Sequence, residues 1–228
     1  MMAAGDVFFI KLTGTGGHGA APHEATDLVA MAGTVIQALT GITRRKIDAS
    51  SPAILSIGRI EGGKSPNVIP AELLLEGTTR YIDPQLGEIF PQLIDQVLQG
   101  VTEAYGGHYH FDYCYGYPVL KNDSKIVDLV RQSATEIAGK NNILPLSKPS
   151  LTSEDFAVYL ERVPGCYFWV GTRNPEKGLI HSLHQPTFDL DEDVFPLAVA
   201  ILANAVLKAL ANRMEGRRCF EVNCNSAG

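Results

Sequence analysis

The sequence lacks several features that would assign it to a special class of proteins. Its four cysteines, Cys114, Cys166, Cys219 and Cys224, are scattered and form neither a disulfide framework nor a zinc-ribbon spacing. A net charge of −6 without a basic patch argues against nucleic acid as a partner. By inspection, no apolar run is long enough to span a bilayer, and the first residues lack the basic and apolar regions of a secretory signal. We therefore expect a cytoplasmic protein that binds neither nucleic acid nor membrane.

What is present is the composition of an ordinary globular protein, with 45% hydrophobic and 19% charged residues. Alternating apolar and polar residues predict strands over 6–15, 52–60, 71–82 and 108–115. Apolar residues at three- and four-residue steps predict helices over 23–43 and 83–105, the second begun by Asp83 and Pro84. The order strand, helix, strand, strand, helix, strand is typical of an antiparallel sheet with two helices on one face. We therefore expect an α+β fold whose first domain spans 6–117.

The segment 118–212 has a different pattern. Its predicted elements are helices and one compact apolar strand, at 123–139, 153–160, 165–171 and 194–210. A strand that is apolar throughout is typically buried on both faces, and this segment offers it few neighbouring strands. We interpret 118–212 as a piece of a larger α/β sheet, followed by a disordered tail at 213–228.

Two histidines, His18 and His23, lie in a glycine-rich loop between the first strand and the first helix. Glycine allows a sharp turn and the close approach of another molecule, so the loop is a candidate site. Glycine clusters also mark ordinary turns, and the loop alone leaves open whether these are simply exposed histidines.

Other candidates occur at the ends of strands. His184 follows the apolar strand, at the position where α/β sheets place their sites, and an imidazole there could bind a metal. Arg80 near the end of the third strand offers a planar fork for a carboxylate, and Asn67 lies in the loop before that strand. Taken singly, each is also an ordinary loop or edge-strand residue. Ser153 with the acids after it is interpreted as a helix cap rather than a catalytic group.

Five motifs occur in the order found in one family of enzymes. They resemble those of metal-dependent amidohydrolases, the group that includes hippurate hydrolase, N-acyl-amino-acid amidohydrolases and plant auxin-conjugate hydrolases. The motifs are Gly-Gly-His-Gly-Ala-Ala-Pro-His at 16–23, Pro-Asn-Val-Ile-Pro at 66–70, Gly-Thr-Thr-Arg at 77–80, Ser-Glu-Asp-Phe at 153–156 and Leu-His-Gln-Pro at 183–186. Each motif is modest alone, whereas the ordered set is specific.

The resemblance implies a fold, a reaction and partners. Such enzymes have a two-metal, zinc-exopeptidase-like α/β domain interrupted by a βαββαβ lid of ferredoxin-like type that also dimerises. Residues 6–117 resemble the lid, and 118–212 resemble the C-terminal part of the catalytic domain. The implied reaction is hydrolysis of the amide bond of a small N-acyl amino acid. The implied cofactors are two divalent metal ions per site, zinc or manganese, and the implied assembly is a homodimer through the lid.

The resemblance also implies roles for four residues. His184 matches the last metal ligand, and His18 matches the catalytic lid histidine that reaches across a dimer to polarise the scissile carbonyl. Asn67 and Arg80 match residues that hold the carboxylate of the substrate, whereas the role of His23 stays open. The family's Cys-Gly-His-Asp stretch, its paired glutamates and a further histidine do not occur in this sequence. We therefore expect the chain to be incomplete for catalysis, the alternative being an inactive dimerisation or binding module.

Overall fold

The computed structural model describes the backbone of residues 1–224 and the side chains of residues 1–212. The chain divides into two compact units: the first comprises 1–121 and 148–162, and the second comprises 122–147 and the residues after 162. The first boundary lies close to the expected one, but 148–162 join the first unit instead of the C-terminal part. The reason is backbone pairing, since the Ala3 N–H donates to the carbonyl oxygens of Ser150 and Thr152 at 2.9 and 3.1 Å.

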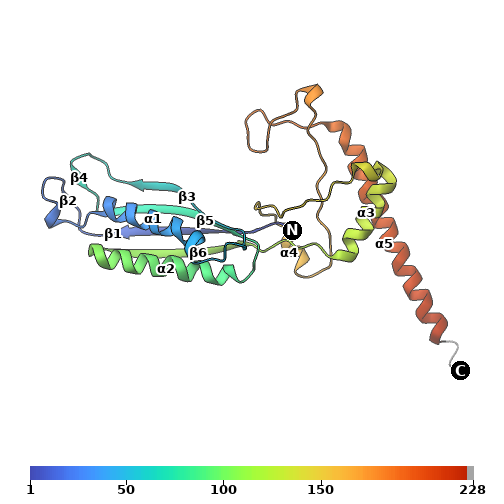
Figure 1. Ribbon diagram of the computed structural model, residues 1–228, viewed down its shortest axis with the longest axis horizontal. Coiled ribbons are helices and arrows are strands. Elements are labelled where there is room, and N and C mark those ends of the chain that lie inside the picture. Colours follow the sequence, from blue (N-terminus) through green and yellow to red (C-terminus); the bar gives the residue numbers. More distant parts are fainter. Residues whose placement is uncertain (225–228) are drawn as a thin grey trace. The chain divides into compact units, whose positions relative to one another are not determined.

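The first unit is a four-stranded antiparallel sheet with two helices, in the predicted order along the chain (Figure 1). The strands pair in the order β3-β5-β1-β6. Its main elements are β1 (Ala4–Thr13), α1 (Leu28–Arg45), β3 (Ala53–Gly62), β5 (Glu72–Tyr81), α2 (Leu86–Tyr105) and β6 (His108–Tyr117). The mixed α/β architecture expected from the sequence is therefore present.

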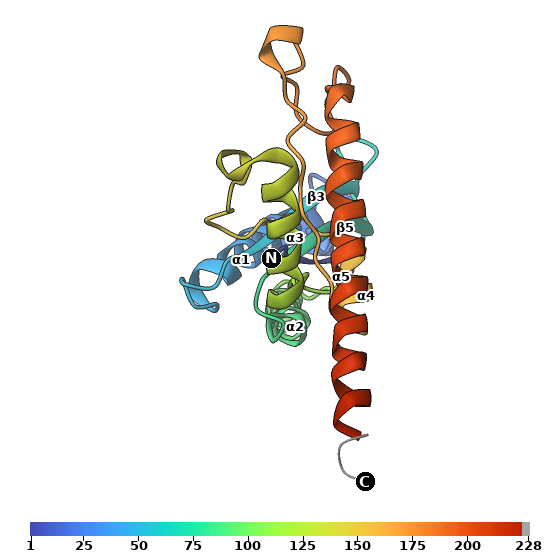
Figure 2. The same ribbon diagram turned by 90° about the vertical axis from the view of Figure 1, so that its right-hand side faces the viewer.

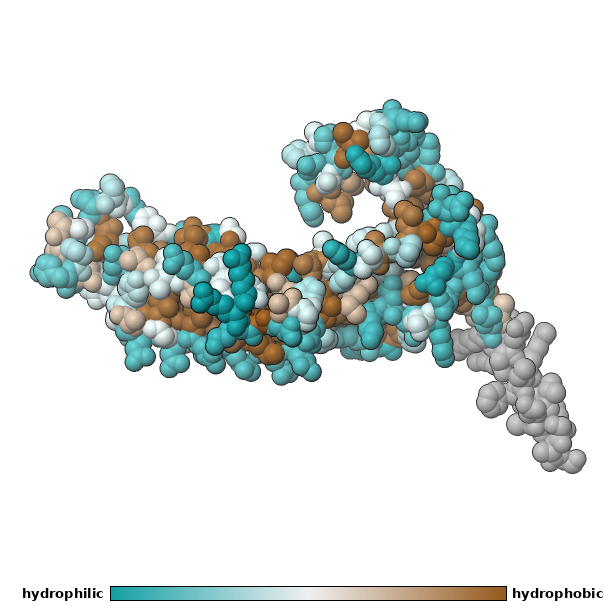
Figure 3. All heavy atoms as spheres, viewed as in Figure 1, coloured by the Kyte–Doolittle hydropathy of each residue, from teal (hydrophilic) through white to brown (hydrophobic). Residues whose placement is uncertain are grey.

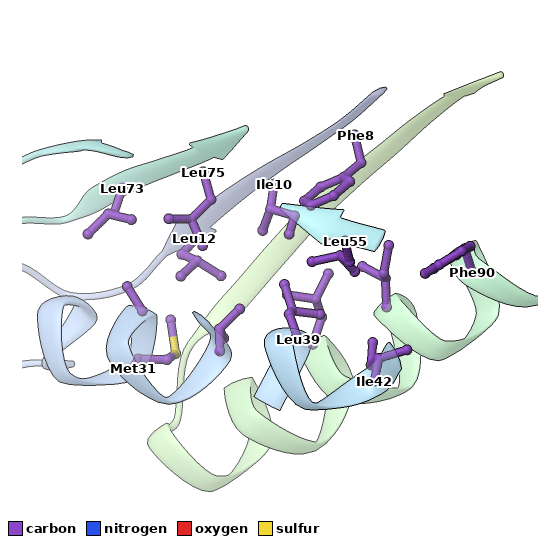
Figure 4. Close-up of a cluster of buried hydrophobic side chains, with 14 of the residues drawn as sticks. Phe8, Ile10, Leu12, Met31, Leu39, Ile42, Leu55, Leu73, Leu75 and Phe90 are labelled. Atoms are coloured by element: carbon purple, nitrogen blue, oxygen red, sulfur yellow. The ribbon is translucent and has the colours of Figure 1, made fainter. Parts of the chain in front are cut away.

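The core of the first unit lies between the sheet and the two helices. On β1, Phe8, Ile10 and Leu12 are each at most 1% exposed, because alternate side chains of a strand point to one face. They meet α1 and α2 (Figure 4), whose fully buried residues include Met31 and Phe90. Burial of each such side chain contributes about 1.5–3 kcal/mol. The opposite face of the sheet stays open.

The ends of the two helices differ from the expected positions. The first helix begins at Leu28 rather than near 23, because Asp27 caps it by accepting the N–H of Ala30 at 3.0 Å. Asp83 does not cap α2; it accepts the N–H of Gln85 at 3.0 Å in the turn before the helix. At its other end α2 stops at Gly106, whose φ of 66° is a left-handed conformation that suits glycine.

The second unit is built on α3 (Ser124–Ala138) and α5 (Phe195–Cys224), which lie side by side (Figure 2). Their contact buries Ile201 and Ala205, each 5% exposed. The longer helix continues past the predicted end at 210. Its backbone is helical over 213–224, where the sequence predicted a disordered tail, and residues 225–228 lie outside the described part of the chain. A short helix, α4 (Phe156–Leu160), belongs to the first unit.

Two expectations for the second unit need correction. The apolar run 165–171 forms no strand, and Trp169 within it is 50% exposed, because no neighbouring strand is available to pair with it. In addition, Glu192–Asn212 is long and apolar enough to cross a membrane, whereas the sequence was expected to contain no such run. That criterion uses length and composition only, and core helices of soluble proteins also meet it. Apolar surface is visible on both units (brown in Figure 3).

Candidate functional site

The glycine-rich loop folds onto the loop that precedes β5. The two loops form a small antiparallel sheet from β2 (Gly17–His18) and β4 (Val68–Ile69), in which His18 lies opposite Val68. Next to it, the Gly19 N–H donates to the Asn67 carbonyl oxygen at 2.8 Å. The structure therefore brings the backbones of His18 and Asn67 together at one end of the main sheet (Figure 1).

Glycine is required at the contact between these loops. A Cβ added at Gly16 would lie 3.0 Å from the Ile69 carbonyl oxygen, and one at Gly19 would lie 3.1 Å from the Asn67 carbonyl oxygen. Larger residues would thus push the loops apart. The loop that carries His18 is packed against its neighbours, which is more than the simple turn that the glycines alone would indicate.

The ring of His18 is oriented by its own loop. Its Nδ1 accepts the backbone N–H of Ala20 at 3.0 Å, so in the neutral ring the proton resides on Nε2. The side chain is exposed, which leaves Nε2–H free to donate to an oxygen of another molecule. His23 lies nearby on a single 3-10 turn, Pro22–Glu24, and its Nε2 is 3.8 Å from a carboxylate oxygen of Glu24.

Arg80 lies near the opposite end of β5 from Asn67. Its Nη1 donates to the Thr79 carbonyl oxygen at 2.9 Å, and it has no ion pair with a carboxylate of the described residues. A Cβ added at Gly5 would come 3.2 Å from Arg80 Nε and 2.8 Å from Ser153 Oγ. The Arg80 and Ser153 side chains therefore both lie over Gly5, where a guanidinium and a hydroxyl are available to an anion.

The expected pairing of Asn67 with Arg80 does not occur within one chain. Asn67 precedes the start of β5, and Arg80 is nearly at its end. With about 3.3 Å per strand residue, Glu72 and Arg80 are roughly 26 Å apart, which is longer than an N-acyl amino acid. His18 and Asn67 thus form one cluster of the first unit, and Arg80 with Ser153 forms another.

His184 belongs to the second unit and has a special backbone conformation. Its φ is 68°, and it is the non-glycine residue with positive φ in the described part of the chain. It occupies the turn Ser182–Gln185, in which the Gln185 N–H donates to the Ser182 carbonyl oxygen at 3.2 Å. The Gln185 side chain closes the same turn by accepting the Ser182 N–H at 2.8 Å. Strained residues of this kind are concentrated at functional sites, which supports a role for His184.

The base of the loop that carries His184 is closed by a polar network. Asp191 accepts hydrogen bonds from the Asn174 amide and from Lys177 Nζ, each at 2.6 Å. These two hydrogen bonds lower the pKa of the Asp191 carboxyl, and the bond from Asn174 has the larger effect. The network joins the two ends of the loop, so the position of His184 depends on it.

The residues present do not form a metal centre by themselves. Within residues 1–212, no three His, Cys, Asp or Glu side chains lie close enough together to hold a metal ion. His184 is therefore not part of a group of three or more possible ligands within residues 1–212. The fit to the implied two-metal site fails.

Sequence reasoning missed the roles of Ser153 and Gln185. Ser153 does not cap a helix, since α4 begins after Asp155 and has no side-chain cap. Its place near Gly5 and Arg80 depends on the pairing of Ser150 with the residues just before β1, which leaves no local signal. A glutamine directly after His184 could have indicated a closed turn. Asp6 was also missed, although a carboxylate in phase with Phe8 on the core face was a readable signal.

Comparison with known proteins gives concordant results. Residues 16–208 match peptidase family M20/M25/M40. Thermostable carboxypeptidase 2 of Saccharolobus solfataricus is 34% identical over 208 residues, which cover 91% of this chain and 51% of that protein. The N-acyl-L-amino acid amidohydrolase of Geobacillus stearothermophilus is 41% identical over 124 residues, 54% of this chain and 34% of that protein.

A solved structure shows the same fold. The crystal structure of a dinuclear metal-binding peptidase of the M20 family from Bacillus subtilis is 28% identical in sequence, with a TM-score of 0.69. It covers 92% of this chain, which in turn covers 51% of it. The chain thus spans about half the length of the curated relatives that it matches.

Proposed function

Because the chain belongs to peptidase family M20/M25/M40, we propose that it supplies the lid and the C-terminal part of the catalytic domain of an N-acyl-amino-acid amidohydrolase. In this proposal the first unit is the ferredoxin-like lid, and the reaction is hydrolysis of the amide bond. The observation that carries the proposal is Arg80, an arginine without a carboxylate partner among the described residues at the position matched to substrate binding. A free carboxylate is what distinguishes an N-acyl amino acid from other amides.

His18 and Arg80 have complementary parts in this proposal. The His18 Nε2–H donates to the carbonyl oxygen of the scissile amide and stabilises the negative charge that develops there. The guanidinium of Arg80 binds the carboxylate through two parallel N–H donors, with the Ser153 hydroxyl beside it. Divalent metal ions, zinc or manganese, belong to the proposed enzyme, with His184 as one ligand and the others outside the described residues.

The proposal requires two copies of the chain. His18 and Asn67 lie at one end of the lid and Arg80 at the other, too far apart to touch one substrate. We therefore assign His18 and Asn67 of one copy to the same substrate as Arg80 of the second copy, in a homodimer formed through the lid. The proposed enzyme acts in the cytoplasm, in agreement with the free thiols of Cys114 and Cys166.

The proposal can be tested by grafting. Residues 16–208 would replace the matched segment of the Saccharolobus carboxypeptidase, whose stability helps it to tolerate a graft. We expect the chimaera to hydrolyse hippurate and expect His18→Ala to lower kcat about 10²–10³-fold, as for loss of an oxyanion donor. His23→Ala, at an exposed neighbouring histidine, is the matched control and should have little effect.

Two results of this experiment would contradict the proposal. One is a folded, metal-loaded dimeric chimaera that does not hydrolyse N-acyl amino acids. The other is an active chimaera in which His18→Ala leaves kcat unchanged. If the chimaera does not fold, binding of hippurate to the 228-residue chain, and its loss in Arg80→Ala, tests the role of Arg80 directly.

A second candidate function is an inactive dimerisation or binding module. It is favoured by the finding that no group of three potential metal ligands lies together in residues 1–212. The test is to measure metal content and hippurate hydrolysis of the purified chain with zinc or manganese added. Both an incomplete enzyme and an inactive module should give neither bound metal nor turnover. Stoichiometric metal with turnover would show that the chain carries a complete site and would contradict both incompleteness and inactivity.

A further inference from the structure

A buried carboxylate lies directly behind the cluster formed by Arg80 and Ser153. Asp6 on β1 is 2% exposed and points to the core face of the sheet. Its Oδ2 accepts the hydroxyl groups of Tyr81 and Tyr113, both at 2.8 Å, and its Oδ1 accepts the N–H of Gly116 at 2.9 Å. A buried carboxylate is costly unless it is hydrogen-bonded, and Asp6 has three donors.

The direction of one further hydrogen bond follows from this arrangement. The Thr79 and Tyr113 hydroxyl oxygens are 2.6 Å apart, and Tyr113 uses its single proton on Asp6. Thr79 must therefore be the donor to Tyr113. Burial is the main reason that the pKa of Tyr81 and of Tyr113 is raised, and the hydrogen bond to Asp6 adds to it. Both phenols therefore keep their protons at neutral pH.

The network holds both chain neighbours of Arg80. Tyr81 is bound to Asp6 directly, and Thr79 is bound to it through Tyr113. Side chains alternate along a strand, so these two neighbours point into the core while Arg80 points to the opposite face. Thr79 also accepts the Nη1–H of Arg80 on its carbonyl oxygen. The position of the guanidinium is thus fixed from both sides by one carboxylate.

The same carboxylate also holds the surface against which Arg80 lies. The pairing of β1 with β6 is irregular between Gly5 and Val7, and Asp6 is the residue at this irregularity. By accepting the Gly116 N–H, Asp6 ties β6 to the bulge. Gly5 is the register partner of Arg80 on β5, so the backbone beneath the guanidinium is held by the same group.

We propose that Asp6 is a positioning residue for carboxylate recognition: through Tyr81 and through the Tyr113–Thr79 pair it holds Arg80 ready to bind the carboxylate of the substrate. This inference rests on the proposed function, which assigns the substrate carboxylate to Arg80. It deepens that function because it identifies the group that preorganises the arginine. No member of the network touches the substrate.

The test compares two ligands that differ only in the recognised group. Calorimetric titration of the 228-residue chain with hippurate and with its carboxamide gives an affinity ratio that reports carboxylate recognition alone. We expect Asp6→Asn and Thr79→Val to lower this ratio about five- to tenfold, with the affinity for the carboxamide unchanged. Thr79→Ser keeps the donor and should restore the ratio. A purely structural role would weaken both ligands equally and leave the ratio unchanged, which would overturn the inference.

The matched control is Tyr109→Phe. It removes a tyrosine–aspartate bond of similar length, 2.7 Å between Tyr109 Oη and Asp95 Oδ1, between α2 and β6 and outside the network. It should leave the ratio unchanged. A ratio that falls as much in Tyr109→Phe as in Thr79→Val would count against a specific role of the network. If Asp6→Asn does not fold, Thr79→Val alone tests the inference, because it removes only the hydrogen bond between Thr79 and Tyr113.

Failure of the proposed function is distinguishable from failure of this inference. If the wild-type chain binds hippurate and its carboxamide equally, or binds neither, the carboxylate role of Arg80 fails. The network is then judged by ¹⁵N relaxation of the Arg80 Nε–H group. Loss of order in Thr79→Val, with recovery in Thr79→Ser, supports positioning by the network. Equal order in all three proteins contradicts it.

Discussion

The two units differ in where their apolar residues lie. In the first unit, one cluster joins strands β1, β3 and β5 with both helices, and Phe8, Leu75 and Phe90 are completely buried in it. In the second unit, α5 contacts α3 through one stripe only, and Leu202 and Leu207 remain 56% and 66% exposed. The first unit therefore has a hydrophobic core of its own, whereas the long helix of the second leaves much of its apolar surface exposed.

This difference agrees with the extent of the match to known proteins. The chain covers about half of its relatives, and its second unit corresponds to a part of their catalytic domain under the proposed function. The run 165–171 has the composition of a central strand, but no strand among the described residues pairs with it. Both observations are what the proposed function expects if the first unit is the lid and the second is part of the catalytic domain.

The largest expected effect is on the core of the first unit. Phe8→Ala should lower the free energy of unfolding of this unit by about 3–5 kcal/mol, since the ring is fully buried against Gly77. Phe9→Ala, on the open face at 40% exposure, is the control and should cost far less. Urea denaturation followed by tyrosine fluorescence measures both. Similar losses would mean that the open face is also packed.

A smaller effect of opposite sign is expected in the second unit. The Ser133 hydroxyl in α3 is buried and has no hydrogen-bond partner among the described residues. Ser133→Ala should therefore raise the free energy of unfolding by about 1 kcal/mol. Ser124→Ala, at the exposed start of the same helix, provides the comparison. Destabilisation by Ser133→Ala in a thermal melt would show that the hydroxyl has a partner in solution.

The exposed apolar surface of α5, which includes Leu202 and Leu207, should affect association of the chain more than its stability. Leu202→Glu should change the free energy of unfolding by less than about 0.5 kcal/mol, because surface substitutions usually have small effects. It should nevertheless reduce concentration-dependent association, measured by sedimentation velocity. Ile201→Glu, on the buried side of the same helix, should instead unfold the helix pair. Unchanged association in Leu202→Glu would show that the chain does not associate through this surface of α5.

The smallest effect is local and depends on pH. The pKa of Asp191 is lowered in the folded chain. The contribution of its ionised form to the stability of the loop is therefore fully present above the ordinary aspartate pKa of about 4. This contribution is lost as the pH falls through the lowered pKa. Exchange protection of the Asn174 and Leu179 amides, which pair with each other, should therefore fall in acid. Asp191→Asn should show this loss at neutral pH, and Asp189→Asn should not. Equal protection in wild type and Asp191→Asn would contradict the role of the network.

The sequence predicted the first unit well because its signals are local. The alternation of Phe8, Ile10 and Leu12 is decided by neighbouring residues, and the same holds for the spacing of apolar residues in α1. The run 165–171 was mispredicted as a strand because pairing depends on strands that are absent. Ser153 was placed wrongly for the same reason, since its position near Gly5 and Arg80 depends on distant backbone pairing.

The candidate site was predictable in its residues but not in its grouping. The motifs predict His18, Asn67, Arg80 and His184 as site residues, and the structure brings only His18 and Asn67 together. That Asn67 and Arg80 cannot meet in one chain follows only from the length of β5. Their proposed roles stay predictions until a variant is measured.

The most direct test of the difference between the units is amide hydrogen exchange on the intact chain, read by mass spectrometry. We expect slow exchange in β1, β5 and both helices of the first unit, and fast exchange over most of 163–193, where few backbone groups other than the Asn174–Leu179 pair are hydrogen-bonded. That result would show that the first unit is stably folded by itself and that much of the second unit is not. Uniformly slow exchange across both units would contradict this account.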